Sequence, residues 1–132
     1  MGMKLTEDNY VDQAEAVIRD LKDRRDRNGR PIPMLTTSKI RNILSMTVDL
    51  YTDILAERQE KLTEDEISRI NYLKLRLVYE CGRDRDVRNF AERAELLSLI
   101  EAARSSRQAY LLFSRYMEAL VAYHRFYGGR EN

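Results

Sequence analysis

Arginine and tyrosine alternate at intervals of three and four residues in one segment, as Arg69, Tyr72, Arg76, Tyr79 and Arg83. In an α-helix this spacing places all five on one side, and arginines seven residues apart are separated by about 10.5 Å along the axis. Guanidinium groups bind phosphates and tyrosine rings stack on bases, so the pattern suits a surface that holds a nucleic-acid strand. A solvated helix face, or a protein interface anchored by tyrosine and arginine, fits the same pattern.

Five other basic residues stand out by position. Lys39 and Arg41 fall in the first turns of a predicted helix, where unpaired backbone amides favour an anion. Lys74 falls within the apolar arc of its helix, and its long side chain can carry the ammonium to the edge of the bundle, where it could also meet a phosphate. For Arg115 and Arg125, near the C-terminus, solvated surface charges are the simpler interpretation.

The overall charge is balanced. The chain has 23 basic and 22 acidic residues, a net charge of +1, with 18 arginines against 5 lysines. A free-standing nucleic-acid binder is usually strongly basic, so any such contact has to be local. The excess of arginine favours phosphate contact, although helix-surface ion pairing or compositional drift explains it equally well.

The residues needed for catalysis are missing from the sequence. It has one histidine and one cysteine, no Glu-x-x-His pair, no glycine-rich phosphate loop and no nucleophile elbow. His124 lies within an apolar arc, which favours a hydrogen-bonded core or interface histidine, and Cys81 also faces inward. Asp84 and Asp86 lie among arginines and are better explained by ion pairing than by acid–base chemistry. We therefore expect no enzymatic activity, no cofactor and no metal.

Length and composition limit the class of protein. The length of 132 residues predicts one domain spanning 1–132. Hydrophobic residues make up 43% of the chain and charged residues 34%, a composition too apolar for a disordered chain. The sequence contains no run of about 18 apolar residues, so no membrane span is predicted. The N-terminal segment lacks an apolar signal region, and the single cysteine excludes a disulfide framework, so we expect a cytoplasmic protein without membrane contact.

Apolar residues recur at intervals of three and four through most of the chain, and no stretch sustains strand-like alternation. This pattern predicts an all-α fold, a compact single-domain bundle of about five helices. The predicted helices run from about Thr6 to Arg27, from Thr36 or Thr37 to around Gln59–Lys61, from Thr63 to Gly82, from about Asp86 to Arg104, and from about Ser106 to Tyr127.

Local signals mark several of these boundaries. Thr6 can cap the first helix, and Thr63 followed by Glu66 forms a capping box. Gly82 lies where a left-handed residue would end the third helix. An Asn-Gly pair and two prolines make a loop over about residues 28–35, the segment that we expect to be flexible.

The apolar positions predict which sides of the helices are buried. In the third helix the expected inward residues include Leu77, Val78 and Cys81. The fifth helix is the most apolar and ends at Gly128-Gly129. Its apolar arc covers about half of its circumference, so it lies either at the centre of the bundle or partly in a partner.

Three segments together resemble a known family. They are LTTSKIRNIL at Leu35–Leu44, YLKLRLVYECGR at Tyr72–Arg83 and YMEALVAYHRFYGG at Tyr116–Gly129. In this order and spacing they closely resemble the small helical subunit of type III-A CRISPR–Cas (Csm) effector complexes, and the opening LTEDNYVDQAE resembles it as well. The loop from Asn28 to Met34 is the part without a match.

The resemblance implies a non-catalytic protein of antiviral defence. Members of that family look like helical bundles that stack in several copies beside the duplex of guide RNA and target RNA. They contact mainly the target-strand backbone, without sequence specificity. The implied partners are this duplex, further copies of the chain, and other subunits, including the backbone subunit and the large polymerase-like subunit; nuclease and cyclic-oligoadenylate synthesis belong to other subunits. The candidate RNA contacts are Lys39, Arg41, Lys74, Arg76, Arg83, Arg115 and Arg125.

Two other functions stay open on the sequence. The first is a helical protein–protein adaptor without direct RNA contact, whose Tyr/Arg side docks a partner. The second is an unrecognised enzyme, for which loss of activity in His124→Ala without loss of structure would be the sign. We expect basic groups on the second, third and fifth predicted helices to form one face.

Overall fold

The fold is all-α, as the periodicity predicts. The computed structural model describes residues 2–128, and within them no strand accompanies the six helices. These helices are α1 (Tyr10–Lys22), α2 (Thr37–Ala56), α3 (Glu64–Arg83), α4 (Arg85–Ala94), α5 (Leu96–Ala102) and α6 (Arg107–Phe126). One predicted helix is divided in two, so six helices replace the expected five.

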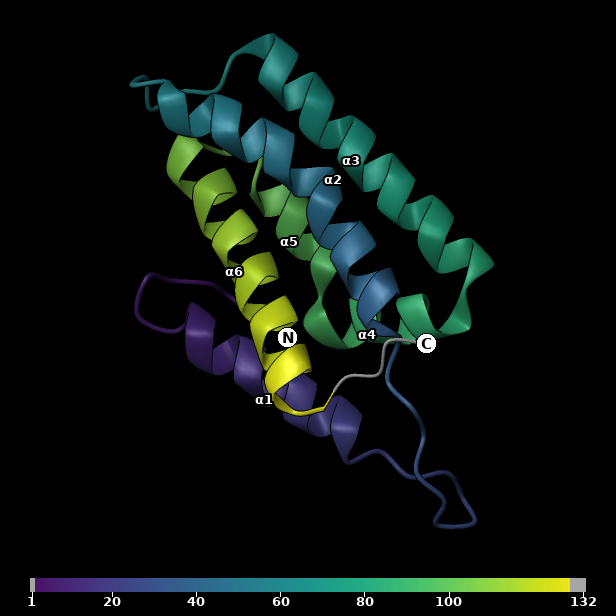
Figure 1. Ribbon diagram of the computed structural model, residues 1–132. Coiled ribbons are helices and arrows are strands. Elements are labelled where there is room, and N and C mark those ends of the chain that lie inside the picture. Colours follow the sequence, from purple (N-terminus) through teal and green to yellow (C-terminus); the bar gives the residue numbers. More distant parts are fainter. Residues whose placement is uncertain (1, 129–132) are drawn as a thin grey trace.

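Helix α6 is the central element. It packs mainly against α1 and α2 and also touches α5, and Figure 1 shows it lying beside α2 and crossing α1. Its inward side chains, including Tyr110, Tyr116, Met117 and Leu120, have no exposed surface. The broad apolar arc is therefore explained by burial against neighbouring helices of the same chain.

Three helix starts follow the local signals. Thr36 caps α2 by accepting a hydrogen bond from the Lys39 amide at 3.3 Å. Thr63 and Glu66 form the expected capping box at α3, with reciprocal bonds of 3.1 and 2.9 Å. Ser106 caps α6. Each of these caps satisfies amides that have no partner inside the helix, so short sequence windows suffice to predict them.

The first helix is shorter than predicted at both ends. Its regular part begins at Tyr10 and follows a turn in which the Thr6 hydroxyl accepts from the Asn9 amide at 3.1 Å. It ends at Lys22 instead of Arg27. Leu21 is the last buried residue, and beyond it no apolar side exists that could pack and stabilise further turns.

The predicted helix from Asp86 to Arg104 is broken at Glu95, whose φ of 58° lies in the left-handed region. Contacts with distant segments hold this break. The Glu95 carboxylate accepts from the Met3 amide at 2.6 Å, and the Tyr116 hydroxyl donates to the Ala94 carbonyl at 3.0 Å. These bonds offset the cost of a left-handed non-glycine residue, about 1–2 kcal/mol.

Two predictions for the third helix, α3, were also wrong. Gly82 does not end α3, which continues to Arg83. The boundary is set by Asp84, whose carboxylate caps α4 by accepting from the Asp86 and Val87 amides at 2.9 and 3.2 Å. Val78, expected to face inward, is 44% exposed. At the C-terminus Gly128 has the left-handed φ of a helix terminator, and Gly129 lies outside the described residues.

The loop around residues 28–35 is held at both ends: backbone hydrogen bonds join Asp26 to Arg30 and Arg24 to Ile32, and Leu35 anchors the other end. Leu35 is buried, and its carbonyl lies 2.8 Å from Nε2 of His124 on α6. The flexibility of the remaining loop stays a prediction. Among the helices of residues 2–128, none combines the length and hydropathy that crossing a membrane requires.

Candidate nucleic-acid interface

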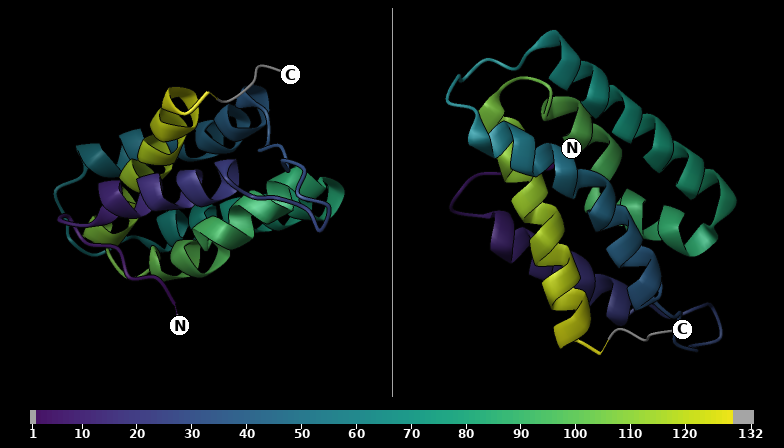
Figure 2. Two further views of the ribbon diagram at one scale, coloured as in Figure 1. Left: turned by 90° about the horizontal axis from the view of Figure 1, so that it is seen from below. Right: turned by 45° about the horizontal axis from the view of Figure 1, so that its top comes forward.

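Helix α3 lies at the edge of the bundle. It packs against α4, α5 and α2, and it forms the outer edge in both Figure 1 and the tilted view of Figure 2. Only Glu66, Ile70 and Leu77 are buried along its 20 residues. One whole side of a long, well-capped helix is therefore presented to solvent as a rigid surface.

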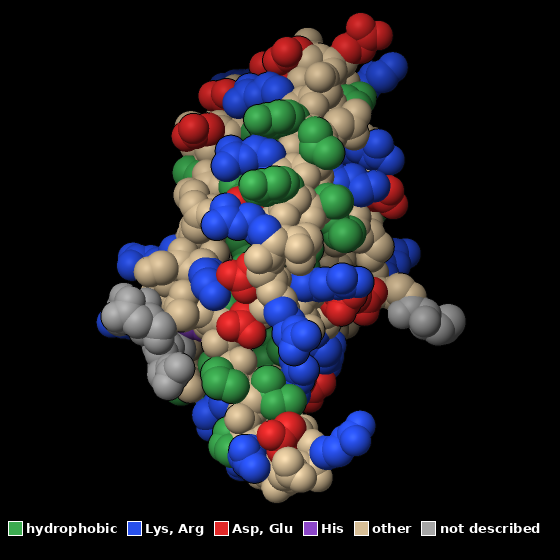
Figure 3. Space-filling view, turned by 90° about the vertical axis from the view of Figure 1, so that its right-hand side faces the viewer, with side chains coloured by type: hydrophobic (Ala, Val, Ile, Leu, Met, Phe, Trp, Pro, Cys, Tyr) green, Lys and Arg blue, Asp and Glu red, His purple; other side chains and the backbone are tan. Residues whose placement is uncertain are grey.

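One face of α3 points outward and is called here the Arg/Tyr face. It is composed of Arg69, Tyr72, Arg76, Tyr79 and Arg83. Tyr72 is 60% exposed and Tyr79 is 65% exposed. Figure 3 shows Lys and Arg side chains alternating with hydrophobic side chains along the upper part of this face. The side chains of this face are therefore accessible to a binding partner.

The three arginines of this face differ in their partners. Arg69 donates to the Asp53 carboxylate of α2 at 2.9 Å. Arg83 lies 3.7 Å from Glu80 and 5.9 Å from the ring of Tyr79, and its side chain is still 62% exposed. Arg76 is exposed between the two tyrosines and has no carboxylate partner among residues 2–128. The middle of the face thus carries an uncompensated positive charge.

Lys39 is held by acidic residues at the junction of α3 and α4. Its ammonium lies 2.8 Å from Asp84 and 3.9 Å from Asp86. The hydrogen bond to Asp84 raises the pKa of Lys39, and the same bond, helped by the capped amides, lowers the pKa of Asp84. Lys39 and Arg83 line one pocket of about 340 Å³, so the structure does bring these two predicted residues together.

Two other predicted contacts are also engaged in ion pairs. Lys74 reaches Glu101 of α5, as expected for a long side chain whose charge lies at the bundle edge. Arg115 donates to Glu7, in the segment before α1, at 2.9 Å. Because their charges are already compensated, these two positions are weaker candidates for phosphate contact than Arg76.

Arg41 and Arg125 lie together in another place. They line a pocket of about 280 Å³ between α2 and α6, beside Thr37 and His124. His124 is fully buried and bonds to the Leu35 carbonyl, so the interpretation as a hydrogen-bonded core histidine is confirmed. The seven predicted residues therefore do not form one face. They fall into separate groups: on α3, where the start of α2 meets the α3–α4 junction, between α2 and α6, and near Glu7.

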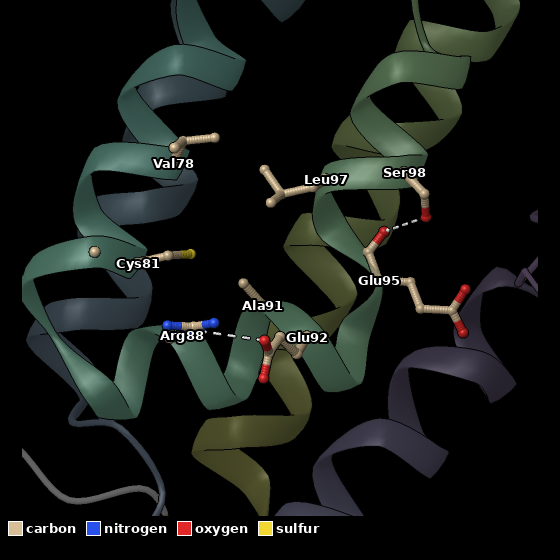
Figure 4. Close-up of a pocket in the computed structure, with 9 residues that line it drawn as sticks. Val78, Cys81, Arg88, Ala91, Glu92, Glu95, Leu97 and Ser98 are labelled. Atoms are coloured by element: carbon tan, nitrogen blue, oxygen red, sulfur yellow. Dashed lines mark hydrogen bonds and ion pairs between the residues drawn. The ribbon is translucent and has the colours of Figure 1, made fainter.

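An apolar groove beside the Arg/Tyr face was not predicted. Val78, Cys81, Ala91 and Leu97 line a cavity of about 510 Å³ where α3 meets α4 and α5. Figure 4 shows these side chains pointing toward one another across the groove, with the Arg88–Glu92 pair at its rim. Burial in this groove is the main cause that raises the pKa of the Cys81 thiol. Glu95, where the chain breaks between α4 and α5, is among the residues that line the groove, and no local signal indicated this break.

Leu75 adds to the apolar surface of α3, with 62% of its surface exposed. Leu75 stands between Lys74 and Arg76 in the sequence, and an apolar residue between two basic ones was the available sign of an exposed apolar position. Among the described residues, no three His, Cys, Asp or Glu side chains gather in a way that could hold a metal ion.

Comparison with known proteins decides the family. Residues 15–130 match the family model described as Csm2 Type III-A. The chain belongs to the Csm2 family. The family resemblance found in three segments of the sequence is thereby confirmed, and it extends over nearly all of the helical fold.

Individual Csm2 proteins align with this chain over most of their length. The "CRISPR system Cms protein Csm2" of Streptococcus thermophilus is 39% identical over 127 residues, covering 96% of this chain and 98% of the relative. The protein of the same description from Mycobacterium tuberculosis H37Rv is 38% identical over 124 residues, with 94% and 95% coverage. That of Enterococcus italicus is 34% identical over 120 residues, with 86% coverage of both chains. The chain is thus a Csm2-type small subunit of a type III-A CRISPR system.

Proposed function

We propose that this Csm2-family chain is a non-catalytic, RNA-contacting small subunit of a cytoplasmic type III-A effector complex. In this role several copies stack along the duplex of guide RNA and target RNA and hold mainly the target-strand backbone, without reading its sequence. Its protein partners are neighbouring copies, the backbone subunit and the large polymerase-like subunit.

The observation that carries the proposal is the exposed Arg/Tyr face with Arg76 uncompensated at its centre. A guanidinium group can make two parallel hydrogen bonds to one phosphate, so Arg76 and Arg83 could bind two phosphates of one strand. The intervening tyrosine rings can lie against the sugars of a paired strand, and they can stack on bases only where the strand is single. Because α3 is already formed and capped, its backbone needs no ordering when the strand binds, and the conformational entropy lost is that of the side chains.

The charge balance of the chain supports a shared role in an assembly. With a net charge of +1, one copy alone attracts RNA weakly. Phosphate contacts position a strand and carry no sequence information, which suits a subunit whose target is selected by guide pairing. Lys39, Lys74 and Arg115 would have to exchange a carboxylate for a phosphate, whereas Arg76 would not.

The test reverses charge at two positions, Arg76→Glu and Arg83→Glu, in the complete effector complex. Both side chains are exposed, but Arg83→Glu gives up the contact with the Tyr79 ring and the pair with Glu80, so we expect the free energy of unfolding to fall by about 1–2 kcal/mol with the fold retained. Retention of labelled target RNA should fall at least about tenfold, since one charge-assisted hydrogen bond contributes about 1.5–3 kcal/mol.

A matched control makes the same charge change elsewhere. Arg58→Glu and Lys61→Glu alter exposed residues in the α2–α3 connection, beyond the N-terminal end of α3. This control should retain target RNA like the unaltered complex. Equal retention by the Arg76/Arg83 variant and the unaltered complex would remove the α3 face from the proposal.

The adaptor without RNA contact remains the second candidate, because the apolar groove and the exposed Leu75 lie next to the Arg/Tyr face. Exposed apolar surface of this kind is typical of protein interfaces. If the face docks a protein, the Arg76/Arg83 variant should fail to co-purify with the other subunits. If the face holds RNA, the variant should assemble normally and lose only the target strand.

A further inference from the structure

The connection between α1 and α2 contains a small hairpin, formed by residues 24–32 and called here the basic hairpin. The Asp26 amide donates to the Arg30 carbonyl and the Ile32 amide to the Arg24 carbonyl, both at 2.9 Å. A bridge between Arg25 and Pro31 completes the pairing. Backbone hydrogen bonds therefore give this segment a defined shape.

Asp26 organises the tip of the basic hairpin. One oxygen of its carboxylate accepts from the Asn28 amide at 2.8 Å and from the Arg30 amide at 3.0 Å. Gly29 takes a φ of 79°, a left-handed conformation that glycine adopts without strain. The negative charge of Asp26 is thus directed at backbone amides, and no ion pair joins it to an arginine of the hairpin within residues 2–128.

The charge of this segment is strongly positive. Residues 22–30 contain five basic and two acidic side chains, a local net charge of +3 in a chain whose total is +1. The guanidinium groups of Arg25, Arg27 and Arg30 are exposed. In the described part of the chain none of them has an ion pair or a side-chain hydrogen bond, in contrast to Lys39, Lys74 and Arg115. Uncompensated and exposed guanidinium groups are well suited to phosphates.

The basic hairpin projects from the helical body at its lower end in Figure 1 and in the tilted view of Figure 2. Figure 3 views the molecule from the side that carries α3. On this side Lys and Arg side chains continue below α3, with some acidic side chains among them, down to the hairpin at the lower end. The Arg/Tyr face and the basic hairpin are therefore open to the same side.

We propose that the basic hairpin is a second RNA-backbone contact, which continues the track of the Arg/Tyr face to the end of the molecule. This inference rests on the proposed function, because it extends the RNA path beyond α3. Arg25, Arg27 and Arg30 supply the phosphate contacts, and Asp26 and Gly29 keep the hairpin folded before RNA arrives. An RNA strand that reaches past α3 gains these contacts, and a shorter one does not.

The length of α3 sets the size of the probes. From Arg69 to Arg83 the face spans about 21 Å at 1.5 Å per residue. At roughly 3.4 Å per nucleotide, about six nucleotides cover it. A fluorescently labelled RNA of about six nucleotides that covers the Arg/Tyr face therefore cannot also reach the hairpin, whereas one of about 20 nucleotides can bridge the two.

The experiment measures anisotropy of both RNA probes with the full-length chain and its variant Arg25→Gln/Arg27→Gln. On the long probe, losing two phosphate contacts should lower the slope of log affinity against log salt by about 1.4, about 0.7 per phosphate. The advantage of the unaltered chain should then shrink about sevenfold between about 50 mM and 200 mM salt. On the short probe the two proteins should bind alike.

Each other outcome has a defined meaning. Equal affinity and slope on the long probe would overturn the inference, while the proposed function would stand if Arg76→Glu/Arg83→Glu still weakens binding. If neither variant weakens binding, both ideas fail. Equal weakening on both probes, or the same effect from Arg58→Gln/Lys61→Gln, would mean that net charge alone is responsible, and the hairpin contact would be rejected.

Discussion

Tyr79 allows the role of the aromatic rings on the Arg/Tyr face to be measured separately from charge. It is 65% exposed, its hydroxyl has no hydrogen bond within the described residues, and its ring lies 5.9 Å from the guanidinium of Arg83. An exposed contact of that kind contributes about 0.5–1 kcal/mol. Tyr79→Ala should therefore lower the free energy of unfolding by no more than about 1 kcal/mol.

The expected effect on RNA binding is larger. Stacking of one base on an aromatic side chain contributes about 1–3 kcal/mol, which corresponds to about 5-fold to 150-fold in affinity. Tyr79→Ala should weaken binding of single-stranded RNA within this range, and Tyr79→Phe, which keeps the ring, should bind normally. Neither substitution removes a charge, so the salt dependence should not change. On duplex RNA, whose bases are paired, the effect should be less than about twofold.

The assay is fluorescence anisotropy with single-stranded and duplex RNA at several salt concentrations, together with chemical denaturation of each variant. Phe126→Ala serves as the control, because it removes a 76% exposed aromatic ring from α6, away from the α3 face. Normal binding by Tyr79→Ala would refute a stacking role for this ring. An equal loss in Tyr79→Phe would show that the hydroxyl, not the ring, makes the contact.

Three further predictions concern stability. Tyr116→Phe leaves the Ala94 carbonyl at the helix break without its hydroxyl partner, which should lower the free energy of unfolding by about 1–2 kcal/mol in urea denaturation. Thr63→Ala removes the capping box of α3 and should lower the free energy of unfolding by about 1 kcal/mol, measured by urea denaturation followed by circular dichroism. Asp84→Asn breaks the ion pair with Lys39 but keeps a capping oxygen. The pKa of Asp84 is lowered in the folded state, so its contribution to stability is fully present above the unfolded value of 3.8. This contribution disappears as the pH falls through the lower folded value. Thermal unfolding should therefore show a less stable Asp84→Asn variant near neutral pH, and the two proteins should converge in acid.

The candidate site was partly predictable because some of its determinants are local. The exposed spacing of Tyr72, Arg76 and Tyr79 follows from helix geometry once the capping box at Thr63 has started the helix. The inward position of His124 was predicted in the same way. Which basic residues remain uncompensated was not predictable, since their carboxylate partners lie far away in the sequence. Lys74 and Glu101 are 27 positions apart, and Arg115 and Glu7 are 108 apart.

The sequence by itself determined the helical class, the start of three helices, the Arg/Tyr side of α3 and the Csm2-like segments, because periodicity and capping act within one or two turns. The tertiary structure decided the break at Glu95, the groove beside α3, the ion pairs that occupy Lys39 and Arg115, and the folding of the basic hairpin. The break, the groove and the ion pairs depend on partners from different segments of the fold, and the hairpin pairs residues up to eight positions apart. A hydrogen bond or an ion pair forms only within a few ångströms, and no local pattern specifies which distant residue will be there.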